Sequence, residues 1–195
     1  MSEKSKNIKD WEKFLDSEGV KNNLIRTSLY LFSYELLKNS IVDKIKDFYC
    51  IGFENNEDIY SKNYNKEVVN RLINGKQNIF LSSLYWLEEH GAITKDEINE
   101  ISDIREFRNT VAHQIDRILA DNDYNIDENK ERRMFELMRK IEVWWIIEVE
   151  IPTNPDFDEK EIIYDEILPG KEIFYNYIQT ITKELLKKKG EPSGE

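Results

Sequence analysis

The chain has 195 residues, of which 39% are hydrophobic, and its 39 acidic and 28 basic side chains give a net charge of −11 at pH 7. This apolar share, which includes four Trp, ten Tyr and nine Phe, supports a buried core and argues against wholesale disorder. The acidic balance argues against a protein that coats long nucleic acid, because such proteins present a broad cationic face. It permits an enzyme that binds one or two phosphates in a cleft, and it leaves room for a basic partner.

The chain has only seven glycines and four prolines, whereas the turns that separate strands are usually rich in these residues. We therefore expect an all-α protein, and the length favours a single helical domain over residues 1–195. The lone Cys50 excludes an intramolecular disulfide and fits a reducing cytoplasm. The polar start "MSEKSKNIKDW" has no signal-peptide core, and no run approaches the roughly 18 apolar residues of a spanning helix. We expect a cytoplasmic protein without a membrane segment.

The first part of the chain predicts two helices followed by a loop. "NIKDWEKFLDS" (residues 7–17) predicts a short N-terminal helix. Apolar residues at helical spacing then predict one long helix from Lys21 to about Cys50. The next segment, "GFENNEDIYSKNYN", is rich in Asn and Asp and predicts a loop.

A helical pattern resumes near Lys66, pauses at Asn74-Gly75 and ends at Gly91, a residue type that commonly follows a helix. "TKDE" predicts a capping box, in which the Thr94 side chain accepts a hydrogen bond from the Glu97 backbone and Glu97 returns the contact. A new helix therefore begins directly after Thr94.

We expect this helix to span about residues 95–119, because its apolar residues form one stripe: Ile98, Ile101, Ile104, Val111, Ile115 and Leu119. Asp127 can cap a further helix through "MFELMRKIEVWWIIEVE", which the prolines of "IPTNPDFD" then interrupt. A last helix is predicted over about residues 171–188. The sum is an up-and-down bundle of about five substantial helices plus the short N-terminal one.

The segment "IREFRNTVAHQI" places Arg105, Arg108, Asn109 and His113 within nine residues of this helix. At about 100° per residue, Arg108 falls within the apolar stripe, whereas Asn109 and His113 lie together on its edge, one turn apart. Arg105 belongs to the same edge. A guanidinium on an apolar face is costly unless it is paired or faces a cleft.

One interpretation of Arg108 is structural. Glu35 also interrupts an apolar helical run, in "LYLFSYELLKN", and is a candidate partner for a buried or half-buried ion pair. Helix geometry alone slightly favours such a structural pair over a functional cleft, because structural ion pairs can mimic sites.

"RNTVAH", from Arg108 to His113, resembles the signature of the HEPN superfamily. In that signature an Arg is followed by a polar residue, usually Asn, Asp or His, and by a His four to six residues further on. The preceding helix end "EEHGAIT" and the capped "KDEINEISDIREFRN" also resemble the family. The specific likeness covers about 30 of the 195 residues, and the rest is similar only as a helical bundle.

The resemblance implies a four- or five-helix bundle that forms a homodimer, in which two motif helices share one cleft. It implies a metal-independent endoribonuclease of toxin–antitoxin, abortive-infection or antiviral defence type, with an RNA substrate and an antitoxin or defence-system partner. The alternative is a non-catalytic HEPN module that binds a nucleotide, RNA or a partner protein. A structural bundle with an Arg108 ion pair is the third hypothesis.

The three motif residues suit RNA cleavage by attack of the ribose 2′-OH, which needs neither cofactor nor metal. Histidine has an unperturbed pKa of about 6.5 and can move protons near neutral pH, the role that we expect for His113. Arg108 can meet phosphate oxygens with its planar fork, and Asn109 can orient the imidazole. Arg105 and Glu35 are supporting candidates, and the second His113 of a dimer can supply an acid to complement the base.

Other polar features have structural interpretations. One Cys and two distant His are a poor zinc set, and neither His belongs to a Glu-x-x-His pair. His90 precedes Gly91 at a helix end and is interpreted as structural. Arg132 and Arg133 are expected on a solvated helix face, with phosphate contact as the alternative. "VWWII" is expected in the core or at a dimer interface rather than in an RNA-stacking platform.

Overall fold

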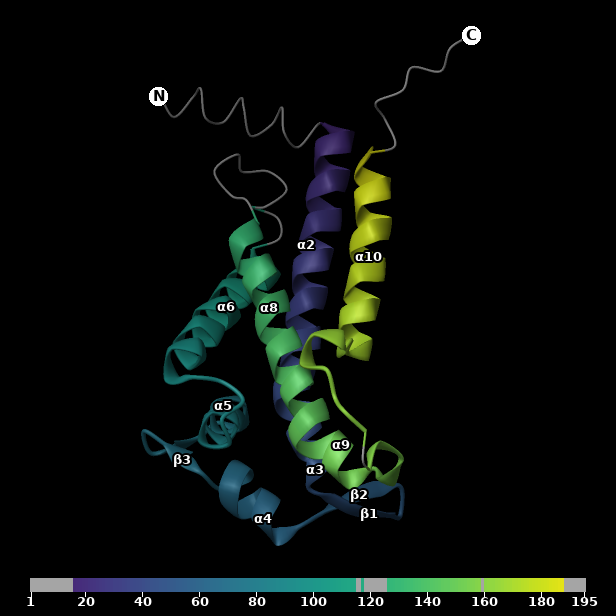
Figure 1. Cartoon of the computed structure of the whole chain (residues 1–195). Helices are drawn as coiled ribbons and strands as arrows, with labels where there is room; N and C mark the ends of the chain where they lie inside the picture. The colour runs from purple at the N-terminus through teal and green to yellow at the C-terminus, as the bar shows by residue number, and fades with distance from the viewer. Residues whose placement is uncertain (1–15, 115–116, 118–125, 159, 188–195) are drawn as a thin grey trace.

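The computed structural model describes residues 16–114, 117, 126–158 and 160–187, and these residues form a bundle of helices with two small β-hairpins. Four long helices run up and down: α2 (Ser17–Lys38), α6 (Lys95–His113), α8 (Glu128–Trp145) and α10 (Gly170–Lys187). Helices α2 and α8 point the same way and α6 and α10 the opposite way, while α5 (Ile79–Glu89) lies across them (Figure 1). The expected all-α bundle is confirmed.

The long N-terminal helix is confirmed, although it begins four residues before Lys21. The Asp16 side chain caps α2 by accepting a hydrogen bond from the Glu18 backbone. The helix continues through a π-helical turn, Asn39–Asp43, into α3 (Lys44–Phe48). The short helix expected over residues 7–17 lies almost wholly outside the described residues.

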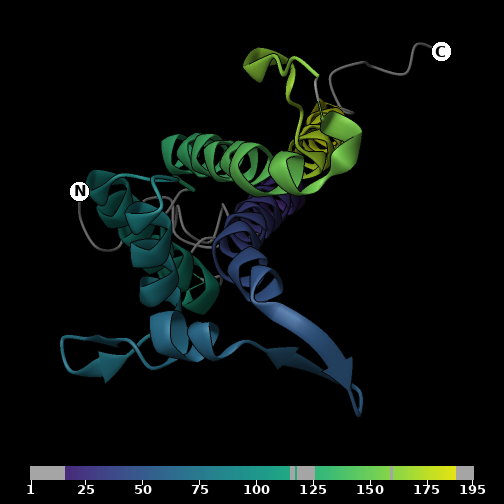
Figure 2. The ribbon, with the colours of Figure 1, turned by 60° about the horizontal axis from the view of Figure 1, so that its bottom comes forward.

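The prediction of a loop after the long helix was wrong. Strands β1 (Cys50–Glu54) and β2 (Glu57–Tyr60) form an antiparallel hairpin that projects away from the helices (Figure 2). Its two turn residues, Asn55 and Asn56, both have positive φ, as a two-residue type I′ turn requires. Except for half-buried Tyr60, the strand residues are exposed, so no buried face produced an alternating pattern.

The predicted helix from Lys66 to Gly91 was also wrong in part. Only a short helical segment, α4 (Lys62–Tyr64) with the π-helical turn Asn65–Val69, precedes a second hairpin, β3 (Leu72–Ile73) and β4 (Lys76–Gln77). The pause at Asn74-Gly75 is the turn of that hairpin, with positive φ at both residues.

Helix α5 ends as the sequence predicts. Gly91 has a φ of +79°, its N–H donates to Glu88 O, and the Ala92 N–H donates to Leu87 O. These two bonds form a Schellman motif, which satisfies carbonyls at the end of the helix. The Thr94–Glu97 capping box then starts α6, with both reciprocal hydrogen bonds present.

Helix α6 ends at His113, six residues before the predicted end at residue 119, because Gln114 leaves the helical conformation. The described part of the apolar stripe is buried as expected, at Ile98, Ile101, Ile104 and Val111. Ile115 and Leu119 lie outside the described residues.

The C-terminal helices follow the prediction. Asp127 caps α8 through the Asn129 and Lys130 N–H groups. The helix continues through a π-helical turn, Ile146–Glu150, and α9 (Ile151–Thr153). Two short 3₁₀ turns, Pro155–Phe157 and Tyr164–Glu166, lead to α10, whose bounds lie within one residue of the expected 171–188.

The core confirms a structural role for "VWWII". Trp145 is 2% exposed, stacks on Trp86 with ring centroids 5.7 Å apart, and donates its indole N–H to Ser40 O. Trp144 packs edge-on against both Trp rings. These contacts join α8 to α5 and to the π-helical turn of the long helix, which fixes the elements that surround the motif helix.

Candidate functional site

Arg108 extends from α6 toward α2, where its guanidinium meets Glu35. Arg108 Nη2 lies 2.8 Å from Glu35 Oε1, and Arg108 Nη1 lies 3.4 Å from the Oδ1 of its neighbour Asn109. The third donor atom, Nε, is buried and has no hydrogen-bond partner among the described residues. Arg108 and Glu35 side chains keep 31% and 46% of their surface exposed, so the pair lies at a boundary rather than in the core.

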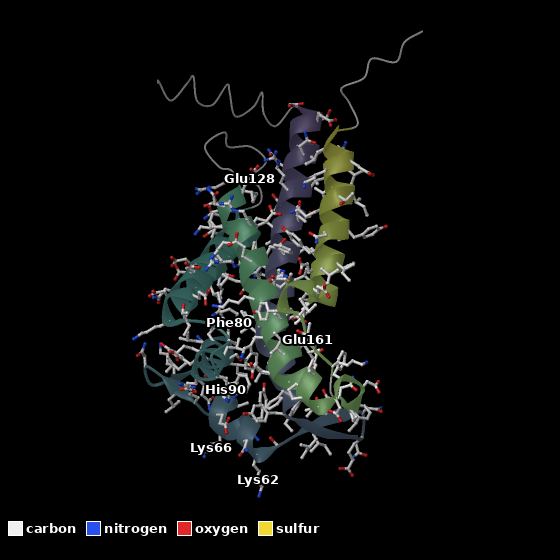
Figure 3. All side chains as sticks on the ribbon, viewed as in Figure 1. Lys62, Lys66, Phe80, His90, Glu128 and Glu161 are labelled. Atoms are coloured by element: carbon white, nitrogen blue, oxygen red, sulfur yellow. The ribbon has the colours of Figure 1, made fainter. Side chains whose placement is uncertain are left out.

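This arrangement contains the ion pair that the structural interpretation predicts, and it also opens onto a pocket. A pocket of about 290 Å³ lies where α2 and α6 meet the start of α5. Its lining includes Lys38, Arg105, Arg108 and Asn109, together with the rings of Tyr34 and Phe80. We call it the motif pocket; Phe80 marks its α5 side in Figure 3.

Both motif-helix arginines lie against aromatic rings in the motif pocket. The Arg105 guanidinium carbon is 4.7 Å from the centre of the Phe80 ring, and that of Arg108 is 5.3 Å from the centre of the Tyr34 ring. Such cation–π contacts orient a guanidinium and leave its edge donors available. Burial raises the pKa of the Tyr34 hydroxyl, with the two nearby guanidinium groups opposing the rise, so the ring is a neutral wall.

The electrostatics of the motif pocket are dominated by three cations around one carboxylate. Glu35 bridges two of them, because its Oε2 lies 3.1 Å from Lys38 Nζ while its Oε1 holds Arg108. Arg105 is the third, on the Phe80 side. Among the lining residues, the cationic charge therefore exceeds the anionic charge by two, a surplus that suits an anionic ligand.

Asn109 and His113 lie on the exposed edge of α6, as the helix geometry predicts. Both residues are exposed, and His113 is the last helical residue. Asn109 lines the motif pocket, whereas His113 is one turn further on and is not among its lining residues. Within the chain, the structure brings Glu35, Arg105, Arg108 and Asn109 together and leaves His113 beside this group.

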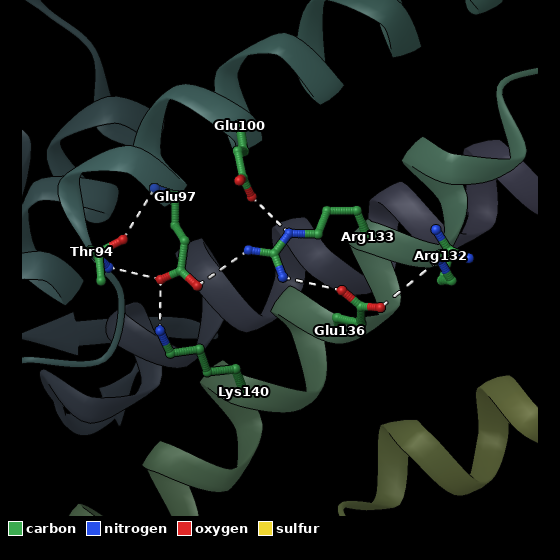
Figure 4. Close-up of polar contacts among 7 residues, drawn as sticks. All are labelled: Thr94, Glu97, Glu100, Arg132, Arg133, Glu136 and Lys140. Carbon is green, nitrogen blue, oxygen red and sulfur yellow. Dashed lines mark hydrogen bonds and ion pairs between the residues drawn. The ribbon is translucent and has the colours of Figure 1, made fainter.

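Arg133 has a structural role, in agreement with the expected solvated, ion-paired face. It contacts Glu100 at 2.7 Å, Glu136 at 3.1 Å and Glu97 at 3.4 Å (Figure 4). Lys140 holds the other oxygen of Glu97 at 2.7 Å. Burial raises the pKa of the Glu97 carboxyl, but the hydrogen bonds from Lys140 and the Thr94 N–H, with the charges of Lys140 and Arg133, hold it below its usual value. This network joins α6 to α8.

His90 is likewise integrated into the fold. Its ring stacks on Trp86 with centroids 3.9 Å apart, and its Nδ1 lies 2.7 Å from Trp86 O. This geometry agrees with the structural interpretation of the second histidine and leaves His113 as the one histidine beside the motif pocket.

A larger pocket, of about 690 Å³, lies between α2, α8 and α10 and contains none of the motif residues. Its inner wall carries Glu131, which accepts hydrogen bonds from the Tyr175 hydroxyl and the Gln179 amide. Burial raises the pKa of the Glu131 carboxyl. Its cationic and anionic lining groups nearly balance, so this pocket favours an anionic ligand less clearly than the motif pocket does.

Among the described residues, no group of three or more His, Cys, Asp or Glu side chains is placed to hold a metal ion. No helix in the described ranges is long and apolar enough to cross a membrane. No protein-family model, curated protein or solved structure matches this chain. The function is therefore inferred from the geometry and charge of the site.

Five lining residues of the motif pocket were not predicted as site residues from the sequence: Tyr34, Lys38, Val42, Ile79 and Phe80. A signal existed for Lys38, because it follows Glu35 by three residues on the same helical face. Tyr34 and Phe80 are ordinary core aromatics by pattern, and only the packing of α2 and α5 against α6 brings them to the arginines.

Proposed function

We propose that the protein is a metal-independent endoribonuclease of HEPN type, acting as a toxin or anti-phage effector. The observation that carries the proposal is the motif pocket, in which Arg105, Arg108 and Lys38 converge beside two aromatic rings and next to the Asn109–His113 edge. Converging cations suit a phosphodiester, because guanidinium and ammonium groups contact its phosphate oxygens. The two rings are buried and hold the guanidinium groups in place by cation–π contact.

In the proposed reaction, the ribose 2′-OH attacks the adjacent phosphorus, the phosphorus–O5′ bond breaks, and a 2′,3′-cyclic phosphate and a 5′-hydroxyl form. His113 moves a proton from the 2′-OH or to the departing 5′-oxygen. Arg108 binds the phosphoryl oxygens, whose negative charge grows in the transition state. Asn109, one turn before His113, orients the imidazole or contacts the phosphate.

A homodimer completes the proposed site, because one protomer supplies a single motif histidine. If the exposed edges of two α6 helices face each other, one His113 acts as the base and the other as the acid. An antitoxin or another defence-system protein would then control access to the shared cleft. Analytical ultracentrifugation of the active protein tests this: a strictly monomeric protein that cleaves RNA contradicts the shared site.

The proposal is tested with an oligodeoxynucleotide that contains one internal ribonucleotide, incubated with the protein in excess EDTA. The expected result is cleavage 3′ of the ribonucleotide and a cyclic phosphate on the 5′ product. Replacing the ribonucleotide with its 2′-O-methyl form should abolish cleavage, because the internal nucleophile is then blocked. Cleavage of the 2′-O-methyl oligonucleotide would contradict attack by the 2′-OH.

One observation favours a second candidate, a non-catalytic module that binds RNA, a nucleotide or a partner. His113 does not line the motif pocket within one protomer, so the pocket as described can bind phosphate without a proton-transfer group. The same oligonucleotide assay distinguishes the two functions, because a non-catalytic module binds the oligonucleotide and leaves it intact.

A further inference from the structure

We propose that Glu35 occupies the phosphate position of the motif pocket in the free protein, so that RNA binds by displacing this carboxylate from Arg108 and Lys38. The inference rests on the proposed function in that it assigns the motif pocket to a phosphodiester. It adds two points: Glu35 keeps other anions out of the pocket, and the need to displace Glu35 limits the affinity of the pocket for RNA.

The geometry of Glu35 is that of a built-in anion. One carboxylate oxygen lies 2.8 Å from Arg108 Nη2 and the other lies 3.1 Å from Lys38 Nζ. A phosphate has the same two features, a negative charge and oxygens that can contact two cations at once. Glu35 therefore satisfies the donors that a phosphodiester would use.

The contact is suited to exchange. The Glu35 side chain is 46% exposed and those of Lys38 and Arg108 are 46% and 31% exposed, so water screens both pairs. Partly exposed pairs of this kind contribute little net free energy. Because Glu35 is on α2 and Arg108 is on α6, a rotation of the Glu35 side chain frees the guanidinium without moving either helix.

Arg108 already presents the donors that a phosphate would use. Its Nη1 and Nη2 contact Asn109 and Glu35, and a guanidinium that binds a phosphate through its fork uses two donors together. Its Nε is buried, has no hydrogen-bond partner among the described residues, and is closed to a ligand. The cation–π contact with Tyr34 keeps the guanidinium plane in place when Glu35 is displaced.

The test measures binding of a fluorescein-labelled single-stranded oligodeoxynucleotide by fluorescence anisotropy. This probe lacks the 2′-OH and reports binding independently of cleavage. Glu35→Gln keeps the side-chain shape and removes the charge, and we expect about tenfold tighter binding, the size of the repulsion between a carboxylate and a nearby phosphate at a protein surface. In an Arg108→Ala background the same substitution should gain less than about threefold, because the released donors are absent.

Glu150→Gln is the matched control. Glu150 contacts Lys44 at 2.7 Å and is 52% exposed, so this substitution removes the same charge from a similar pair away from the motif pocket. We expect binding within about twofold of the wild type, as only a change in net charge is involved. Circular dichroism melting of each variant confirms that the fold is retained.

Unchanged or weaker binding by Glu35→Gln overturns the proposal and makes Glu35 a positioning residue for Arg108. Absence of binding by both the wild type and Glu35→Gln also overturns it. Tighter binding by Glu35→Gln without any RNA cleavage leaves the displacement intact and refutes the ribonuclease. Cleavage of RNA by the wild type without tighter oligonucleotide binding by Glu35→Gln refutes the displacement and leaves the ribonuclease intact.

Discussion

Arg108 of α6 and Glu35 of α2 form a 2.8 Å ion pair across the wall of the motif pocket. The pair joins two helices whose residues are 73 positions apart in the chain, and it leaves both side chains in contact with solvent. Its position explains why an arginine interrupts an apolar stripe: the described apolar residues of the stripe are buried, whereas Arg108, on the same face of α6, lines the pocket. Because both side chains are partly exposed, the pair contributes little to stability, and its role is better explained by the chemistry of the pocket.

Arg108→Ala should separate stability from activity. We expect the free energy of unfolding to fall by about 1 kcal/mol or less, because partly exposed ion pairs contribute little. RNA cleavage should fall at least a hundredfold, the scale of a lost transition-state cation. Arg108→Lys keeps the charge but not the fork, so it should retain stability and lose most activity. Urea denaturation measures the free energy of unfolding, and initial rates measure RNA cleavage. A loss of cleavage that comes with a large loss of stability would make the role of Arg108 structural.

The Glu97 network should make stability depend on pH in the acidic range. Its contacts lower the pKa of Glu97 in the folded state below the unfolded value, so the carboxylate stabilises the fold fully above about pH 4.3. This stabilisation is lost as the pH falls through the folded-state pKa. Glu97→Gln should cost about 2 kcal/mol at pH 7 and much less at pH 3. A difference between wild type and Glu97→Gln that stays constant from pH 7 to pH 3 in urea denaturation contradicts this account.

Lys171 anchors the start of α10 through a largely buried ion pair. Its Nζ lies 2.7 Å from Glu142 Oε1 and 3.0 Å from Ser40 Oγ, and the Glu142 side chain is only 6% exposed. Burial lowers the pKa of the Lys171 ammonium, and the contact with Glu142 opposes that change. Lys171→Met should destabilise by about 3 kcal/mol because it leaves a buried carboxylate unpaired.

The double variant Lys171→Met/Glu142→Leu is the control for that prediction. Replacing both charges with apolar groups of similar size should recover most of the loss. Denaturation midpoints of the two variants give the comparison, and equal destabilisation would show that lost packing, rather than the unpaired charge, is responsible.

Gly91→Ala isolates a backbone effect. No atom of the described residues outside the adjoining chain lies within 4 Å of the position of an added Cβ, so the cost arises only from the φ of +79°. We expect a loss of about 1 kcal/mol in the free energy of unfolding. Gly52→Ala is the matched control, because its Cβ also meets no atom and its φ is not in the left-handed region. It should be neutral or slightly stabilising, and an equal loss at both sites would contradict the assigned cause.

The sequence correctly predicted several helix ends, because these depend on interactions between residues that are close together in the chain. Thr94 with Glu97, Gly91 and Asp127 marked helix ends because their side chains or their backbone freedom act within four residues. The hairpins were missed because nearly all of their strand residues are exposed, which hides the alternation of a half-buried strand. The turn pairs Asn55-Asn56 and Asn74-Gly75 were the available signal, since Asn tolerates positive φ.

The candidate site was predictable only in part. Arg108 and Glu35 stood out because each interrupts an apolar run, and the structure pairs them. The pocket around them depends on how α5 crosses α6, which no spacing within one helix encodes. The end of α6 at His113 was missed for a related reason: apolar spacing continued to residue 119, and spacing alone does not show where the backbone leaves the helix.

Cleavage of RNA in EDTA by two matched histidine variants tests the central claim most directly. His113→Gln removes the proposed proton-transfer group, and His90→Gln changes the other histidine, which stacks on Trp86 away from the motif pocket. The account predicts that wild type and folded His90→Gln cleave at similar rates, whereas His113→Gln is slower by at least about a hundredfold. Equal cleavage by His113→Gln and the wild type would contradict it.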